Sequence, residues 1–119
     1  TAEALLLARS SLVTYSRAFG LPSPIDGVTV SVNEQEQVMA DASYARQLGF
    51  GGKLAIHPNQ ISTIKGAFAP SHDQLDWARR VMHANEAADG AAVLMDGQMV
   101  DTPIIEKARQ MLRTSQTVL

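Results

Sequence analysis

The sequence predicts an α/β fold that is incomplete within this chain. Apolar residues at helical spacing alternate with short runs rich in β-branched residues, in the order helix, strand, helix, strand, helix, helix, hairpin, helix. Two strands joined through a helix are expected to be parallel neighbours. Parallel sheets are covered on both faces and usually contain more strands. We therefore expect a piece of a larger α/β domain, unless other chains complete the sheet.

The first helix and the first strand follow from periodicity. Residues 3–19 place apolar side chains at steps of three and four, and Gly20 with two nearby prolines ends this helix. Residues 25–32 are rich in β-branched side chains and alternate toward their end, which is typical of a strand.

A second helix and strand follow. Asn33 and Glu36, three residues apart, predict a capping pair for a helix that stops at Gly49. Residues 53–57 predict the second strand. A short helix comes next, and Gly66 leaves the position of its end open.

The last part of the chain predicts two helices around a hairpin. Ser71 and Gln74 form a capping pair for the first of these helices. Residues 91–100 predict two short strands joined by a two-residue turn. Thr102 is expected to cap the last helix, with Pro103 at its first position.

Composition excludes several classes of function. The chain has 119 residues with 10 Lys and Arg against 12 Asp and Glu, so it lacks the basic surface that nucleic acids or anionic membranes require. It has no cysteine, which removes disulfides, zinc–cysteine sites and thiol nucleophiles. Its apolar runs are too short to cross a bilayer. Its histidines and carboxylates show no metal-ligand spacing.

Three residues are candidates for chemistry, each with a structural alternative. His57 ends the second strand, at the edge where parallel sheets bind ligands, or it only fixes the loop that follows. Asp26 lies early in the first strand and either faces a ligand or caps a turn. Asp101 precedes the last helix, where the helix dipole favours a negative charge.

Several stretches, in this order and spacing, resemble the citrate lyase beta subunit and malyl-CoA lyase family. The most specific is the Gly-Phe-x-Gly-Lys-x-x-Ile-His-Pro core within residues 49–61. The others include Ile25-Asp26-Gly27-Val28 and Met99-Val100-Asp101-Thr102-Pro103. The resemblance extends over essentially the whole chain.

The resemblance implies the C-terminal portion of a (β/α)₈ TIM barrel with a C-terminal extension. Residues 1–69 would be a partial barrel segment, from the sixth helix to the eighth with the seventh and eighth strands. Residues 70–119 would be the extension, with a helix, the hairpin and the last helix. Members of this family make and break a carbon–carbon bond between an acyl-thioester enolate and a keto acid, using a divalent metal, usually Mg²⁺.

The resemblance also assigns roles to residues. Ile56, His57 and Pro58 would lie at the barrel mouth against the CoA thioester or the keto acid, largely through backbone groups. Asp26 is a further candidate for contact with the substrate or CoA. Asp101 would be the catalytic aspartate, moving a proton in the site of a neighbouring subunit. The metal ligands of the family would all precede Thr1, so none is expected in this chain.

The implied partners follow from these roles. They are an acyl-CoA or acyl-carrier-protein thioester of the citryl or malyl type, further copies in a homo-oligomer, and the missing N-terminal part of the barrel. A cytoplasmic location is expected. The residues leave open which thioester is the substrate. They also leave open a non-catalytic module that mediates oligomerisation or binds acyl-CoA.

The 119-residue chain by itself is expected to be inactive, because the metal ligands implied by the resemblance would lie outside it. The measurement is acyl-CoA lyase activity of the purified chain in the presence of Mg²⁺. Turnover at the rate of a complete enzyme would contradict the expectation.

Overall fold

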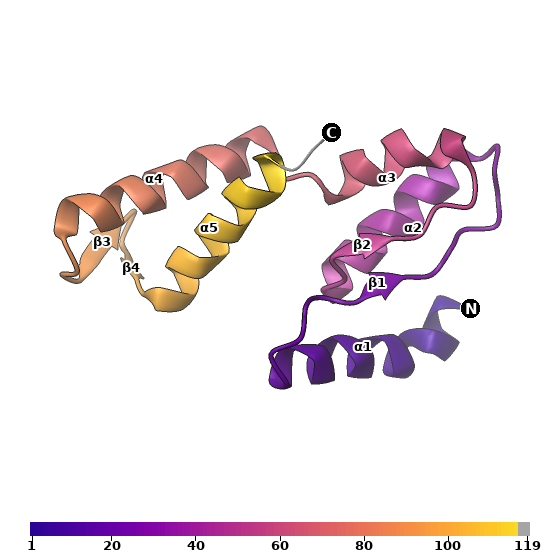
Figure 1. Ribbon diagram of the computed structural model, residues 1–119, viewed down its shortest axis with the longest axis horizontal. Helices are drawn as coiled ribbons and strands as arrows, with labels where there is room; N and C mark the ends of the chain where they lie inside the picture. The colour runs from indigo at the N-terminus through magenta and orange to yellow at the C-terminus, as the bar shows by residue number, and fades with distance from the viewer. Residues whose placement is uncertain (117–119) are drawn as a thin grey trace. The chain divides into compact units, whose positions relative to one another are not determined.

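The protein divides into two compact units. A computed structural model describes residues 1–116 (Figure 1). Unit 1 is Thr1–Phe68, and unit 2 begins at Ala69. Within residues 1–116, no helix combines the length and the apolar character that crossing a membrane requires.

Unit 1 contains a pair of parallel strands flanked by helices, as the sequence predicts. Ile25 pairs with Gly52 and Asp26 pairs with Lys53. The elements in chain order are α1 (Ala2–Ala18), β1 (Ile25–Asp26), α2 (Gln35–Leu48), β2 (Gly52–Lys53), the 3₁₀ turn η1 (Pro58–Gln60) and α3 (Ile61–Phe68).

The strands predicted over residues 25–32 and 53–57 are wrong in extent, because β1 and β2 are only two residues long each. The N–H of Leu54 donates to the carbonyl of Asp26 at 3.0 Å, just after the paired residues. Farther along, side chains take the place of a partner strand. Lys53 donates to the carbonyl of Gly27 at 2.7 Å, and Gln60 donates to the carbonyls of Thr29 and Ser31 at 2.9 and 3.1 Å. These carbonyls therefore find donors without a backbone ladder.

The cap predicted for α2 is also wrong. Glu34 occupies the cap position and makes no side-chain capping hydrogen bond, so Asn33 and Glu36 do not form a capping box. Gly49 does end α2, in a left-handed conformation with φ of 106°. Gly66 does not interrupt α3, which continues to Phe68.

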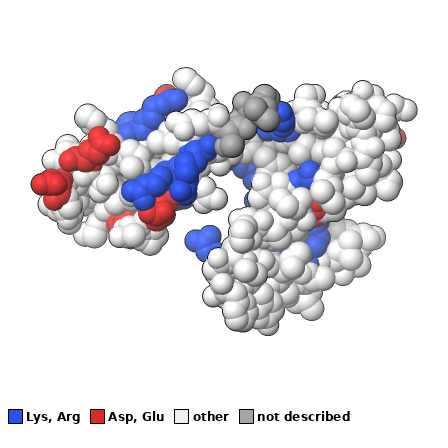
Figure 2. All heavy atoms as spheres, viewed as in Figure 1, with Lys and Arg blue, Asp and Glu red and all other residues white. Residues whose placement is uncertain are grey.

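The core of unit 1 lies between α2 and α3, which run side by side in Figure 1. Many large apolar side chains of this unit remain exposed outside that core, and Figure 2 shows few charged side chains on the visible face of unit 1. The core consists of Val38, Ala42, Ile64 and Ala67, with Phe68 packed against it. The exposed residues on the two strand segments are Ile25, Val28, Val30, Leu54 and Ile56.

Unit 2 consists of two helices connected by a β-hairpin, as predicted. Ser71 and Gln74 form a complete capping box at the start of α4, with hydrogen bonds of 3.1 and 2.8 Å. The hairpin turns at Asp96 and Gly97, both with positive φ, as a two-residue turn of type I′ requires. The elements are α4 (His72–Ala88), β3 (Val93–Met95), β4 (Gln98–Val100) and α5 (Thr102–Gln116).

The core of unit 2 joins all of its elements. Ala78 and Val81 of α4 pack with Val100 of β4 and Ala108 of α5. On the surface, the Arg80 guanidinium donates to both carboxylate oxygens of Asp96, at 2.8 and 2.9 Å. Hydrogen bonding to Asp96 and attraction by its charge raise the pKa of Arg80.

Two glycine substitutions should change stability in opposite directions. Gly49→Ala should destabilise the chain by about 2 kcal/mol, because the residue has a positive φ and a Cβ would lie 2.7 Å from Val13 Cγ1. Gly66→Ala, in a helix with open space around it, should stabilise the chain by about 0.5–1 kcal/mol. Urea unfolding followed by circular dichroism measures both. Equal effects of the two substitutions would contradict this account.

Candidate functional site

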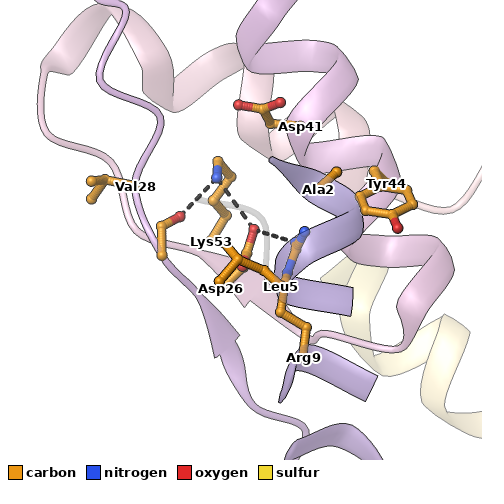
Figure 3. Close-up of a pocket in the computed structure, with 9 residues that line it drawn as sticks. Ala2, Leu5, Arg9, Asp26, Val28, Asp41, Tyr44 and Lys53 are labelled. Atoms are coloured by element: carbon orange, nitrogen blue, oxygen red, sulfur yellow. Dashed lines mark hydrogen bonds and ion pairs between the residues drawn. The ribbon is translucent and has the colours of Figure 1, made fainter. Parts of the chain in front are cut away.

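Asp26 lies between two cations at the junction of β1 and β2. Its Oδ2 accepts from Arg9 Nη2 at 3.0 Å and from Lys53 Nζ at 3.3 Å (Figure 3). The Asp26 side chain is 12% exposed, and that of Lys53 is only 3% exposed. Burial weakens the screening of these charges by water, so the ion pairs are stronger than surface pairs.

Arg9 also connects α1 to the aromatic side chains of its surroundings. Its guanidinium carbon lies 5.2 Å from the ring centre of Tyr44 and 5.3 Å from that of Phe50, within the range of cation–π attraction. Its Nε is buried and has no hydrogen-bond partner within residues 1–116. A pocket of about 420 Å³ opens beside these residues. Its lining is Ala2, Leu5, Arg9, Asp26, Gly27, Val28, Asp41, Tyr44 and Lys53.

This pocket does not suit a metal ion. The carboxylate of Asp26 already neutralises charge on Arg9 and Lys53. Asp41, the other acid of the lining, accepts from Thr29 Oγ1 at 2.6 Å and from Gln37 Nε2 at 2.7 Å. Across residues 1–116, no three His, Asp or Glu side chains come together as a metal site would need. Asp26 is thus an ion-pair partner in this structure, and its contact with a substrate stays a prediction.

His57 is exposed at the beginning of η1, after the segment that follows β2. Its Nδ1 accepts from the N–H of Asn59 at 3.1 Å and so caps the 3₁₀ turn. In the neutral ring Nδ1 is therefore the acceptor, and Nε2 carries the proton. His57 therefore fixes the loop that follows β2, which is the structural alternative to ligand binding. Its Nε2–H is still an available hydrogen-bond donor, because the side chain is exposed.

Most backbone groups around His57 are already paired. The N–H of Ile56 donates to Gln60 Oε1 at 2.9 Å, and the carbonyl of His57 accepts from the N–H of Gln60 at 3.0 Å. The carbonyl of Pro58 accepts from the N–H of Ile61, and proline has no N–H of its own. Within the described residues, the carbonyl of Ile56 and the N–H of His57 have no partner. These two groups belong to one peptide unit, the 56–57 peptide.

Gln60 is the residue that the sequence reasoning missed. It is fully buried, and its side-chain amide contacts the backbone at Ile56, Thr29 and Ser31. The available signal is its place two residues after the most specific motif, within the stretch 49–61 that contains it. Nothing local marks a glutamine there as buried, because its partners lie as much as 31 residues away.

Asp101, in unit 2, caps α5. Its Oδ1 accepts from the N–H of Ile104 at 3.2 Å, and its carbonyl accepts from that of Ile105 at 3.0 Å. The prediction that Thr102 is the cap is therefore wrong, because Thr102 is already the first residue of the helix. The side chain of Asp101 is exposed, and its Oδ2 has no partner among residues 1–116. Its predicted role in catalysis stays a prediction.

Sequence comparisons relate the chain to a group of lyases. No protein-family model matches it. The citrate lyase subunit beta of Escherichia coli K12 is 37% identical over 115 residues, which are 94% of this chain and 38% of that protein. A citrate lyase subunit beta-like protein of Mycobacterium tuberculosis H37Rv is 38% identical over 105 residues, 88% of this chain. The chain spans less than two fifths of the length of these relatives.

Solved structures agree with the sequence comparisons. CitE of Mycobacterium tuberculosis, in complex with magnesium, acetoacetate and coenzyme A, matches 91% of this chain with a TM-score of 0.73 and 36% identity. A citrate lyase of Burkholderia xenovorans LB400 matches 95% with a TM-score of 0.74 and 25% identity. The match covers 40% and 35% of those chains.

Removing the charge of Asp26 should destabilise unit 1. Asp26→Asn leaves Arg9 and the buried Lys53 without their carboxylate, which should cost about 3 kcal/mol. The control is Asp76→Asn, which breaks an exposed ion pair with Arg79 and should cost less than about 0.5 kcal/mol. Urea unfolding measures the difference. Similar costs for the two variants would show that the Asp26 ion pairs add little stability.

Proposed function

This chain is a homologue of the citrate lyase beta subunit over most of its length, and on that premise we propose that it forms the C-terminal part of a carbon–carbon lyase. The lyase would cleave or form citryl-type or malyl-type acyl thioesters, carried by CoA or an acyl-carrier protein, through an enolate. The observation that carries the proposal is the match to CitE, a protein whose structure contains magnesium, acetoacetate and coenzyme A.

Unit 1 is proposed to be the end of a (β/α)₈ barrel, with β1 and β2 as its last two strands. The parallel pairing of β1 with β2 and the flanking helices support this assignment. So do the exposed apolar side chains on the two strand segments, such as Ile25 and Leu54, which in a complete barrel would be covered by other strands.

The segment around His57 is proposed to contact the thioester or the keto acid. It follows β2, at the carboxyl end of a parallel strand, where barrel enzymes place their sites. The N–H of the 56–57 peptide and Nε2–H of His57 are donors that can bind a carbonyl or carboxylate oxygen. Hydrogen bonds of this kind hold the carbonyl of the bound substrate in a fixed position.

Asp101 is proposed to move the proton at the α-carbon of the thioester, in the site of a neighbouring subunit. Its role as a helix cap occupies Oδ1 and leaves Oδ2 available as a base or, when protonated, as an acid. The N–H of Ile104 also holds the carboxylate in one orientation. Mg²⁺, when bound by the rest of the parent protein, would polarise the carbonyl of the keto acid.

Asp101→Asn in the full-length protein should lower kcat by at least about 100-fold and change the thioester KM little, because the residue moves a proton rather than binding substrate. Asparagine caps helices as well as aspartate does, so α5 should stay intact. Steady-state kinetics and circular dichroism measure the two effects. The control is Asp89→Asn, at another exposed aspartate next to a helix end.

Unchanged turnover in Asp101→Asn would remove Asp101 from the mechanism. A full-length protein that cleaves no citryl or malyl thioester would contradict the proposed function itself. Binding of acyl-CoA without cleavage would instead favour the non-catalytic binding module.

A further inference from the structure

We infer that Gln60 is the positioning residue of the site, because its buried side chain orients the 56–57 peptide toward the thioester. This inference rests on the proposed function and adds a residue to it. Gln60 is 0% exposed, although it carries an amide that needs hydrogen bonds on both its oxygen and its nitrogen. All of the contacts it makes through that amide are to backbone groups.

The three contacts join two segments that are far apart in sequence. Oε1 accepts from the N–H of Ile56 at 2.9 Å. Nε2 donates to the carbonyls of Thr29 and Ser31, at 2.9 and 3.1 Å. The two predicted strands form no backbone hydrogen bonds with each other at this point. The side chain of Gln60 links the two segments instead and fixes the spacing between them.

The contact between Gln60 and Ile56 limits the orientation of the next peptide unit, the 56–57 peptide. The 55–56 peptide is held in place, because the N–H of Ile56 donates to Gln60 Oε1. On the other side, the carbonyl of His57 is held by the N–H of Gln60 at 3.0 Å. The 56–57 peptide lies between these two fixed points, and within residues 1–116 both of its polar groups are unpaired. It is thus oriented by its neighbours and free to bind a ligand.

The fixed geometry has a consequence for substrate binding. A donor that is held in place before the substrate arrives loses little conformational freedom when it pairs with the thioester carbonyl, so it strengthens binding of the thioester. Loss of the Gln60 hydrogen bonds would therefore weaken binding of the thioester. The proton transfer assigned to Asp101 would be preserved, because that residue lies in unit 2.

The experiment compares Gln60→Met with Gln47→Met in the full-length protein. Methionine has a similar shape but cannot pair the three backbone groups, and Gln47 is an exposed glutamine on α2. In Gln60→Met, the thioester KM should rise about tenfold with kcat within about threefold of wild type. Hydrogen exchange at the Ile56 amide should also become faster. Gln47→Met should change neither quantity.

A second variant covers the case in which Gln60→Met does not fold. Gln60→Glu keeps an acceptor for the Ile56 N–H but loses both donors, and it sets a carboxylate against the carbonyls of Thr29 and Ser31. It should also raise the thioester KM. Melting temperature is measured for every variant, because a purely structural role would lower it and the amount of active protein without changing KM.

The outcomes separate the two claims. A higher KM in either folded variant, accompanied in Gln60→Met by faster Ile56 exchange, supports the positioning role. Folded Gln60 variants with wild-type KM overturn it, even when the wild-type protein is an active lyase. A wild-type protein without lyase activity overturns the proposed function, and with it the role of Gln60 in binding the thioester. Ile56 exchange in the variants would then report only on the structural contact.

Discussion

In unit 1, two extended segments run side by side after a parallel pairing of only two residues each, and the buried amide of Gln60 holds them together beyond it. A buried backbone group without a partner costs about 1–3 kcal/mol, so the carbonyl of the buried Thr29 must find a donor. Gln60 supplies this donor, and Gln60 and Lys53 also donate to the more exposed carbonyls of Ser31 and Gly27. The path of the chain into His57, and so the geometry of the candidate site, depends on this arrangement.

The ion pairs of Asp26 in unit 1 have a different role from the Gln60 hydrogen bonds. Asp26 joins Arg9 of α1 to Lys53 of β2, so its carboxylate ties a helix to both strands. The groups near His57 that are free to bind a ligand are neutral hydrogen-bond donors and acceptors. The ion pairs around Asp26, which stabilise the fold, are thus separate from the uncharged 56–57 peptide, at which we propose that the thioester carbonyl binds.

In unit 2, the carboxylate of Asp101, which we propose takes part in proton transfer, is positioned by very local structure. The hairpin ends at Val100, and Asp101 follows directly as the cap of α5. One residue therefore serves both the helix and the proposed chemistry. Because only one of its oxygens is used for capping, the two roles do not compete. In the proposed lyase, unit 1 would supply groups that bind the substrate, and Asp101 would transfer a proton in the site of a neighbouring subunit.

The sequence alone determined the features that depend on neighbouring residues. The helices, the Ser71–Gln74 capping box, the hairpin turn and the helix stop at Gly49 all follow from side chains a few positions apart. The parallel pairing of the strands also followed, because a helix between two strands permits little else.

Only the tertiary structure decided where each strand stops, that Asp26 faces two cations, and that Gln60 is buried. Each of these depends on partners 17 to 31 residues away, which no local pattern encodes. The caps of α2 and α5 were also missed, because several neighbouring residues can cap a helix and the path of the preceding chain selects among them. The backbone around His57 is set by such long-range contacts, so the sequence marked His57 as a candidate but revealed neither the role of Gln60 nor the geometry of the site.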